Sequence, residues 1–156
     1  MIAAPDNPYT APMAGLDKNM PIPTEIKLHR QSRLMEVAFP DGNSFRLPYE
    51  YLRVHSPSAE VRGHGPGQET LQTGKREVDI ATVEAVGNYA IRPTFSDGHD
   101  TGLFSWDLLY DLGLNQESYW QAYLARLAAA GASRDVDSTT SFAESGPKAG
   151  GPAEAL

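Results

Sequence analysis

The fold is decided by residues 35–47, which read MEVAFPDGNSFRL. Apolar side chains recur at every second position in the first half of this stretch, at Met35 and Val37, and again in the second half, at Phe45 and Leu47. A period of two places one face of a β-strand against a core. The central Asp-Gly-Asn is a strong turn signal, because glycine readily adopts positive φ. The stretch therefore predicts a β-hairpin.

Secondary-structure patterns extend from this hairpin in both directions. Strand-like alternation covers residues 25–29, 78–86, 89–95 and 101–104. Helical spacing follows Pro48, begins again at Trp106, and returns after Asn115, a predicted N-cap, in an apolar stripe that ends at Gly131. Strands come first and helices last. The sequence therefore predicts an α+β fold, a two-layer sandwich of mostly antiparallel sheet packed against the C-terminal helices.

The chain of 156 residues divides by composition into three parts. Residues 1–20 and 133–156 lack the apolar density that offsets ordering entropy, so we expect a disordered leader and a disordered tail. The folded domain is expected over residues 21–132. Met20 is a conceivable alternative start. No secretory signal pattern is recognisable, so a cytoplasmic location is the expectation.

Charge and cysteine content exclude several classes of protein. Thirteen basic and twenty acidic residues give a net charge of −7. A negative net charge disfavours binding to nucleic acids and to anionic membranes, so we expect neither as a partner. The chain has no cysteine, which excludes disulfides, thiolate catalysis and cysteine-bound iron–sulfur clusters.

A family resemblance rests on three further stretches and one tryptophan. Residues 52–62 read LRVHSPSAEVR, residues 87–89 read GNY, residues 95–99 read FSDGH, and Trp106 follows. Together they resemble the gamma-butyrobetaine hydroxylase-like N-terminal domain over most of residues 24–127. The resemblance implies a similar fold.

The resemblance also implies where a zinc site would lie. In metal-bearing members of that family, three cysteines in a C-x-C-x-x-C spacing and the histidine of the D-G-H turn bind the metal. This chain has Ser56, Ser58 and Val61 at the cysteine positions and keeps only His99. Serine hydroxyls are poor zinc ligands and valine is none. We therefore expect the domain to fold without metal, and His99→Ala to cost about 1 kcal/mol, the value of one hydrogen bond.

His99 nevertheless has two interpretations. It is a residual metal ligand, or it hydrogen-bonds within the Asp97-Gly98 turn. As an alternative, His99 with His55 or His64 forms a weak zinc or iron site. A possible binding surface is predicted at His55, His64, Asp97, Asp100 and Trp106.

No catalytic residues are predicted. None of the four histidines has an acidic residue two positions later, as the iron site of a non-haem oxygenase requires. The sequence contains neither a G-x-S-x-G elbow nor a Walker loop, and the glycine-rich residues 63–67 read as a surface loop. An enzyme of unrecognised type remains a rival interpretation.

The family resemblance implies a function without catalysis. The related domain occurs beside oxygenase domains, joined to iron–sulfur carrier ATPases, and as short bacterial proteins, and in none of these is it the catalyst. We therefore expect a stand-alone binding or adaptor module with an unidentified protein partner, associated by family analogy with iron or iron–sulfur proteins. The alternatives are the histidine metal site and an accessory domain of a 2-oxoglutarate/iron oxygenase system.

Overall fold

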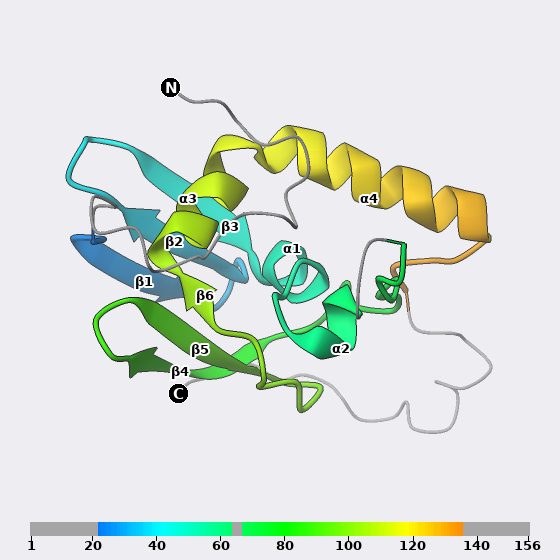
Figure 1. The fold of residues 1–156 in the computed structure, drawn as a ribbon, viewed down its shortest axis with the longest axis horizontal. Coiled ribbons are helices and arrows are strands. Elements are labelled where there is room, and N and C mark those ends of the chain that lie inside the picture. The colour runs from blue at the N-terminus through cyan, green and yellow to red at the C-terminus, as the bar shows by residue number, and fades with distance from the viewer. Residues whose placement is uncertain (1–21, 64–66, 136–156) are drawn as a thin grey trace.

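The computed structural model describes residues 22–63 and 67–135. The predicted leader, most of the predicted tail and His64 lie outside the described residues. The described part combines two antiparallel sheets with four helices, which confirms the predicted α+β class (Figure 1).

The first sheet consists of the predicted hairpin and one strand before it. Its strands, in spatial order, are β1 (Glu25–His29), β2 (Leu34–Ala38) and β3 (Ser44–Pro48). The register of β2 and β3 opposes Met35 to Leu47 and Val37 to Phe45. Met35, Val37 and Leu47 are fully buried, as the alternation predicts. Gly42 in the turn has a φ of 94°, a conformation that favours glycine.

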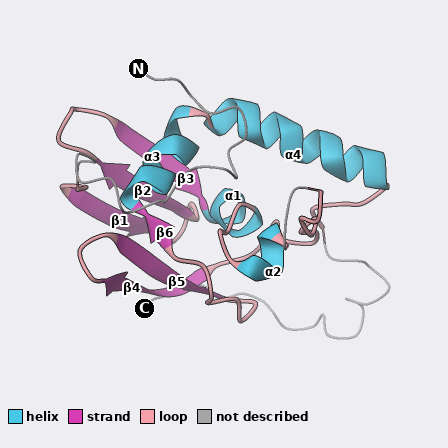
Figure 2. Ribbon diagram, in the orientation of Figure 1, coloured by secondary structure: helices cyan, strands magenta, loops and turns pink. Residues whose placement is uncertain are grey.

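The second sheet is smaller and comes later in the chain. Its strands, in spatial order, are β4 (Ile80–Val86), β5 (Ala90–Phe95) and β6 (Phe104–Ser105). Ile91, Pro93 and Phe95 bury one face of β5. The described strands thus form two sheets, and every strand pair in them is antiparallel, in agreement with the predicted antiparallel character. A connection of more than thirty residues separates β3 from β4 and carries the chain away from the edge of the first sheet (Figure 2).

Four helices complete the described part. They are α1 (Tyr49–Val54), α2 (Ala59–Arg62), α3 (Trp106–Leu114) and α4 (Gln116–Ala130). Ser105 caps α3 by accepting a hydrogen bond from the Leu108 amide, and Gly131 ends α4 in the left-handed conformation, as predicted. Asn115 precedes α4, but its side chain donates back to Asp111 instead of capping. No helix in the described ranges has the length and apolar character of a membrane span.

One hydrophobic core joins the two sheets. Buried side chains from both sheets, from α1 and from α3 form a single cluster. The helix α3 approaches β3 closely: a Cβ atom at Gly113 would lie 2.2 Å from the Phe45 ring, so only glycine fits at this contact. In the described fold the two sheets therefore share one core, and α3 covers the strands.

The last helix packs on α1 and on a loop, away from the sheets (Figure 1). Tyr123 and Leu127 of α4 are buried against Val54 of α1. Trp120 belongs to the apolar stripe of α4 but is only half-buried. The guanidinium of Arg134 lies 5.1 Å from the centre of the Trp120 ring. The helix α3 thus lies directly against the strands, whereas α4 adds Tyr119 and Trp120 to the edge of the main core and packs the rest of its apolar face on α1 and the loop.

The folded part continues beyond the expected boundary at residue 132. The carbonyl oxygens of Ser133 and Arg134 accept hydrogen bonds from the amides of Gly74 and Arg76. Arg134 also donates twice to the buried carboxylate of Glu50, at 2.8 and 2.6 Å. Residues 133–135 thus close over the start of α1 and belong to the folded unit.

Candidate functional site

The serines at the expected cysteine positions lie between α1 and α2. Ser58 is the N-cap of α2, and its Oγ accepts from the Glu60 amide at 3.0 Å. Ser56 Oγ accepts from the Ser58 amide at 3.3 Å. Both serines are buried. Two hydroxyls therefore hold the sharp change of direction between the helices, because one satisfies the buried Ser58 amide and the other caps the first turn of α2.

His99 joins this turn from a distant part of the sequence. The Asp97-Gly98 turn forms, with Gly98 at a φ of 91°, and it places the imidazole inside the protein with an exposed fraction of 6%. Nε2 lies 2.9 Å from Ser56 Oγ, and Nδ1 lies 3.1 Å from a carboxylate oxygen of Glu60. A carboxylate only accepts, so Nδ1 carries the proton and Nε2 accepts from the Ser56 hydroxyl. Both ring nitrogens are thus engaged within the protein.

The residues around His99 do not fit tetrahedral Cys₃His coordination. Val61 is buried and offers no donor atom. The lone pair of His99 Nε2 faces the Ser56 hydroxyl, and a Cβ atom at Gly102 would lie 2.3 Å from that same hydroxyl. Among the residues that the structure describes, no three His, Cys, Asp or Glu side chains gather as metal ligands would. The region is arranged as a hydrogen-bonded turn.

Asp97 anchors a small charged cluster beside this turn. Arg53 of α1 donates to the Asp97 carboxylate at 2.9 Å, and Lys75 donates to the same oxygen. Burial by itself would raise the pKa of Asp97, but the hydrogen bonds from Lys75 and from the His99 amide, with the charge of Arg53, lower it to about 2. Burial and then the charge of Arg53 also lower the pKa of His99. Asp97 therefore carries a negative charge that is balanced internally.

His55 has surroundings of its own at the end of α1. Its Nδ1 donates to the Tyr51 carbonyl at 2.9 Å, and its ring packs against Tyr51, Tyr119 and Tyr123. Burial lowers the pKa of His55 from the usual 6.5 to about 4. The charge of Arg126 acts in the same direction, while the hydrogen bond to Tyr51 opposes it. The imidazole is therefore neutral near pH 7.

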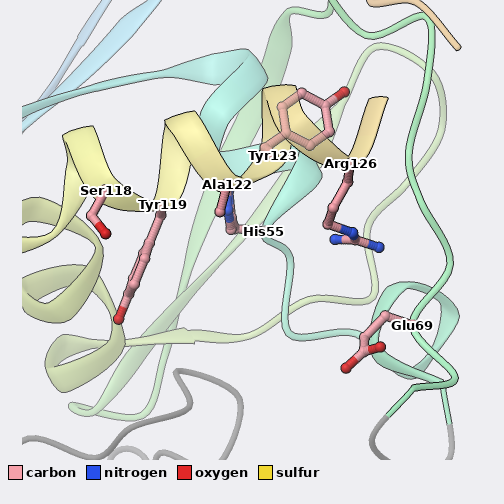
Figure 3. A pocket seen from close by; sticks show the side chains of 7 residues that line it. All are labelled: His55, Glu69, Ser118, Tyr119, Ala122, Tyr123 and Arg126. Carbon is pink, nitrogen blue, oxygen red and sulfur yellow. The ribbon is translucent and has the colours of Figure 1, made fainter. Parts of the chain in front are cut away.

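A cavity of about 300 Å³ opens between this histidine and α4. Figure 3 shows its lining. Three successive turns of α4 provide one wall, and the end of α1 and the loop after α2 provide the others. The lining residues are His55, Glu69, Ser118, Tyr119, Ala122, Tyr123 and Arg126.

The structure separates the residues predicted as one binding surface. Asp97 and Asp100 lie in the turn that carries His99, whereas His55 lines the α4 cavity. Trp106 is 9% exposed, and its Nε1 donates to the Asn88 carbonyl at 2.8 Å. His64 lies outside the described residues, so the predicted combination with it stays a prediction.

Sequence reasoning missed the α4 cavity. Its helical residues, Tyr119, Ala122, Tyr123 and Arg126, are spaced by three and four positions, so they share one helix face. That spacing was visible in the sequence. However, the same spacing is typical of a buried face, and only the packing of α4 on α1 leaves space beside it.

Comparison with known proteins gives a family match and similar structures. Residues 26–110 match the family model described as gamma-butyrobetaine hydroxylase-like, N-terminal. Two solution NMR structures are similar. One has 50% identity and a TM-score of 0.67 and covers 76% of this chain and 94% of its own. The other has 52% identity and a TM-score of 0.66 and covers 76% and 88%.

A crystal structure is also similar. It is that of a protein of unknown function, from Acidithiobacillus ferrooxidans, which belongs to the DUF971 family. It has 37% identity and a TM-score of 0.51, and the match covers 69% of this chain and 98% of the other. No curated protein matches the chain.

Proposed function

Because the chain belongs to the gamma-butyrobetaine hydroxylase-like, N-terminal family, we propose that it is a non-catalytic binding module that acts through a protein partner. The single observation that carries this proposal is the internal pairing of His99 and Asp97 in the candidate site. His99 is bonded to Ser56 and Glu60, and Asp97 is bonded to Arg53 and Lys75. General acid–base chemistry requires a group that exchanges a proton with a bound molecule. Here the imidazole of His99 and the carboxylate of Asp97 are both hydrogen-bonded to other residues of the protein.

Exposed apolar side chains support the binding role. Tyr89, Leu103 and Leu114 are large hydrophobic residues with exposed fractions of 38, 42 and 60%. Tyrosine is enriched among the residues that dominate the binding energy of protein interfaces, and exposed leucines add apolar area that a partner can cover. The narrower proposal, that the partner is an iron- or iron–sulfur-linked protein, rests on family analogy alone.

The proposal is tested by reconstitution. The full chain, tagged and expressed at its native level, is used to identify co-purifying proteins, and each candidate is then purified separately and titrated against the chain. We expect one candidate to form a complex that at least one of Tyr89→Ser, Leu103→Ser and Leu114→Ser weakens about tenfold. Glu84→Gln, an exposed polar change on β4, is the control and should leave the affinity unchanged.

Two outcomes contradict the proposal. Failure of every candidate to bind in purified form would leave no protein partner. The second outcome comes from elemental analysis of the untagged chain, purified without a chelator. One equivalent of zinc or iron per chain that is lost in His99→Ala would favour the metal-binding alternative.

A further inference from the structure

We propose that the cavity between α4 and the end of α1 binds a small planar molecule that carries a hydrogen-bond donor and a carboxylate. This site is separate from the protein-binding role proposed above and does not depend on it. The argument rests on one buried acceptor, two fixed aromatic walls and one cation at the rim.

The acceptor is Nε2 of His55. Nδ1 donates to the Tyr51 carbonyl, so in the neutral ring Nε2 carries the lone pair. No hydrogen bond to Nε2 comes from residues 22–63 or 67–135, although the side chain is only 8% exposed and lines the cavity. The His55 side chain is buried, but within the described residues Nε2 is not among the fully enclosed side-chain atoms that lack a partner, so it is reached from the cavity. A ligand N–H or O–H in the cavity would satisfy it, and the pKa of about 4 keeps this nitrogen unprotonated at pH 7.

The walls are the rings of Tyr119 and Tyr123. The Tyr119 ring is stacked with His55 at 6.1 Å between centroids, and the Tyr123 ring meets His55 edge-on at 6.3 Å. Their hydroxyls are engaged elsewhere: Tyr119 donates to Asp111 at 2.9 Å, and Tyr123 donates to the Gln72 carbonyl at 2.7 Å. The two rings are therefore held in place and present apolar surface. Fixed aromatic surfaces of this kind favour a flat, apolar ligand body.

The cation is Arg126. It is exposed, and it lies near enough to His55 and Tyr123 to influence the pKa of both. Within the described residues, no carboxylate lies within ion-pair distance of its guanidinium. In Figure 3, Arg126 and Glu69 lie toward one end of the cavity and Ser118 toward the other. A planar guanidinium binds a carboxylate through two parallel hydrogen bonds, whereas Glu69 at the same end would repel that carboxylate.

The volume limits the size of the ligand. About 300 Å³ is at the lower end of the range for small-molecule sites, which suits a single substituted ring. We therefore choose 3-hydroxybenzoate and 4-hydroxybenzoate as probes. Each has a flat ring, one hydroxyl donor for His55 Nε2 and one carboxylate for Arg126, and the two isomers sample two separations between those groups.

The experiment is a titration of the full ¹⁵N-labelled chain at pH 7, followed by amide chemical shifts. We expect at least one isomer to give saturable shifts confined to residues near position 55 and positions 118–126. Benzoate, which lacks the hydroxyl, and hydroxybenzyl alcohol, which lacks the carboxylate, should each bind about tenfold more weakly.

Charge variants make the test specific. Arg126→Gln should weaken hydroxybenzoate binding about tenfold, and Glu69→Gln should strengthen it about threefold because the repulsion is removed. Both positions are at the surface or half-buried, so both variants should fold. Arg92→Gln removes a cation from β5 and should have no effect. His55→Phe keeps an aromatic ring without the acceptor and should abolish the preference for hydroxybenzoate over benzoate.

Three results would overturn the proposal. They are the absence of saturable shifts up to about 10 mM of either isomer, shifts centred outside the cavity, and equal affinities in Arg126→Gln and Arg92→Gln. None of these results bears on the proposed protein partner, which is tested by reconstitution alone.

Discussion

His99 shows how one residue supports this fold at the scale of single side chains. It connects the Asp97-Gly98 turn to Ser56 and Glu60, which lie 43 and 39 positions away in the sequence. The hydrogen bond within the turn that the sequence predicts is present, from the His99 amide to Asp97 at 3.2 Å. The His99 side chain adds a buried link between two distant segments, so its loss leaves the buried Ser56 hydroxyl without its imidazole acceptor.

His99→Ala should therefore cost about 2 kcal/mol, above the value of about 1 expected from the sequence, because the buried Ser56 hydroxyl loses its partner. Urea denaturation measures this cost. His29→Ala is the control: that half-exposed histidine pairs with Glu36 at the surface, and its loss should cost less than about 1 kcal/mol.

EDTA should leave the melting temperature unchanged in the wild-type chain, since the turn is held by hydrogen bonds. A fall in melting temperature that one equivalent of zinc reverses, and that His99→Ala abolishes, would contradict this and show a metal site.

The lowered pKa of His55 predicts that the free energy of unfolding decreases as the pH falls from 6.5 to 4. Its pKa is about 4 in the folded protein and near 6.5 in the unfolded chain, so the unfolded chain binds the proton first as the pH falls. This contribution to stability is fully present above pH 6.5 and decreases by about 3 kcal/mol as the pH falls to 4. Urea denaturation of the wild type and of His55→Phe from pH 7 to 4 should show a shallower decrease for the variant.

A control separates His55 from its neighbours. The pKa of His99 is also lowered, so His99→Gln should independently reduce the loss of stability that begins as the pH falls below about 6.5. Asp97, with its pKa lowered to about 2, affects stability only below about pH 4. If His55→Phe and the wild type lose stability in parallel, the imidazole is not held neutral by burial.

At the scale of elements, the segment after α4 acts as a strap. Arg134 pairs with the carboxylate of Glu50, which is only 7% exposed, and lies over the Trp120 ring. The strap also adds two backbone hydrogen bonds to the loop before β4. It therefore ties α4 to α1, two elements that share only a small apolar cluster.

Ending the chain at residue 132 should thus destabilise it by roughly 2–3 kcal/mol relative to ending it at residue 135, because a buried carboxylate loses its partner. Thermal denaturation of the two truncated chains measures the difference. In a Glu50→Gln background the same truncation should cost much less. Equal costs in both backgrounds would show that the ion pair is not the source of the effect.

At the scale of the whole molecule, the two sheets share one core and should unfold together. Val37→Ala in β2 should lower the stability by about 2 kcal/mol, and Ile80→Val in β4 by about 1 kcal/mol. Each should shift one common transition, with circular dichroism and tryptophan fluorescence coinciding. A separate transition in which only one substitution acts would show that the sheets are independent units.

Local features were determined by the sequence itself. The alternation around Met35 and Val37, the Asp-Gly-Asn turn and the stop at Gly131 all depend on the residues within one element. Their physical causes are side-chain period and the backbone freedom of glycine, which act over a few positions. The folding class followed from the order of those elements, and the missing thiolates followed from residue identity alone.

Only the tertiary structure decided the contacts between segments that are distant in the sequence. The division into two sheets, the contact of His99 with Ser56, the pairing of Arg134 with Glu50 and the space beside His55 all join segments that lie far apart in the chain. A helix face with spacing of three and four shows that α4 is amphipathic, but not which element covers it or where a cavity remains. Those contacts depend on how the elements pack in three dimensions, and residue periodicity within one element does not encode the distance to another.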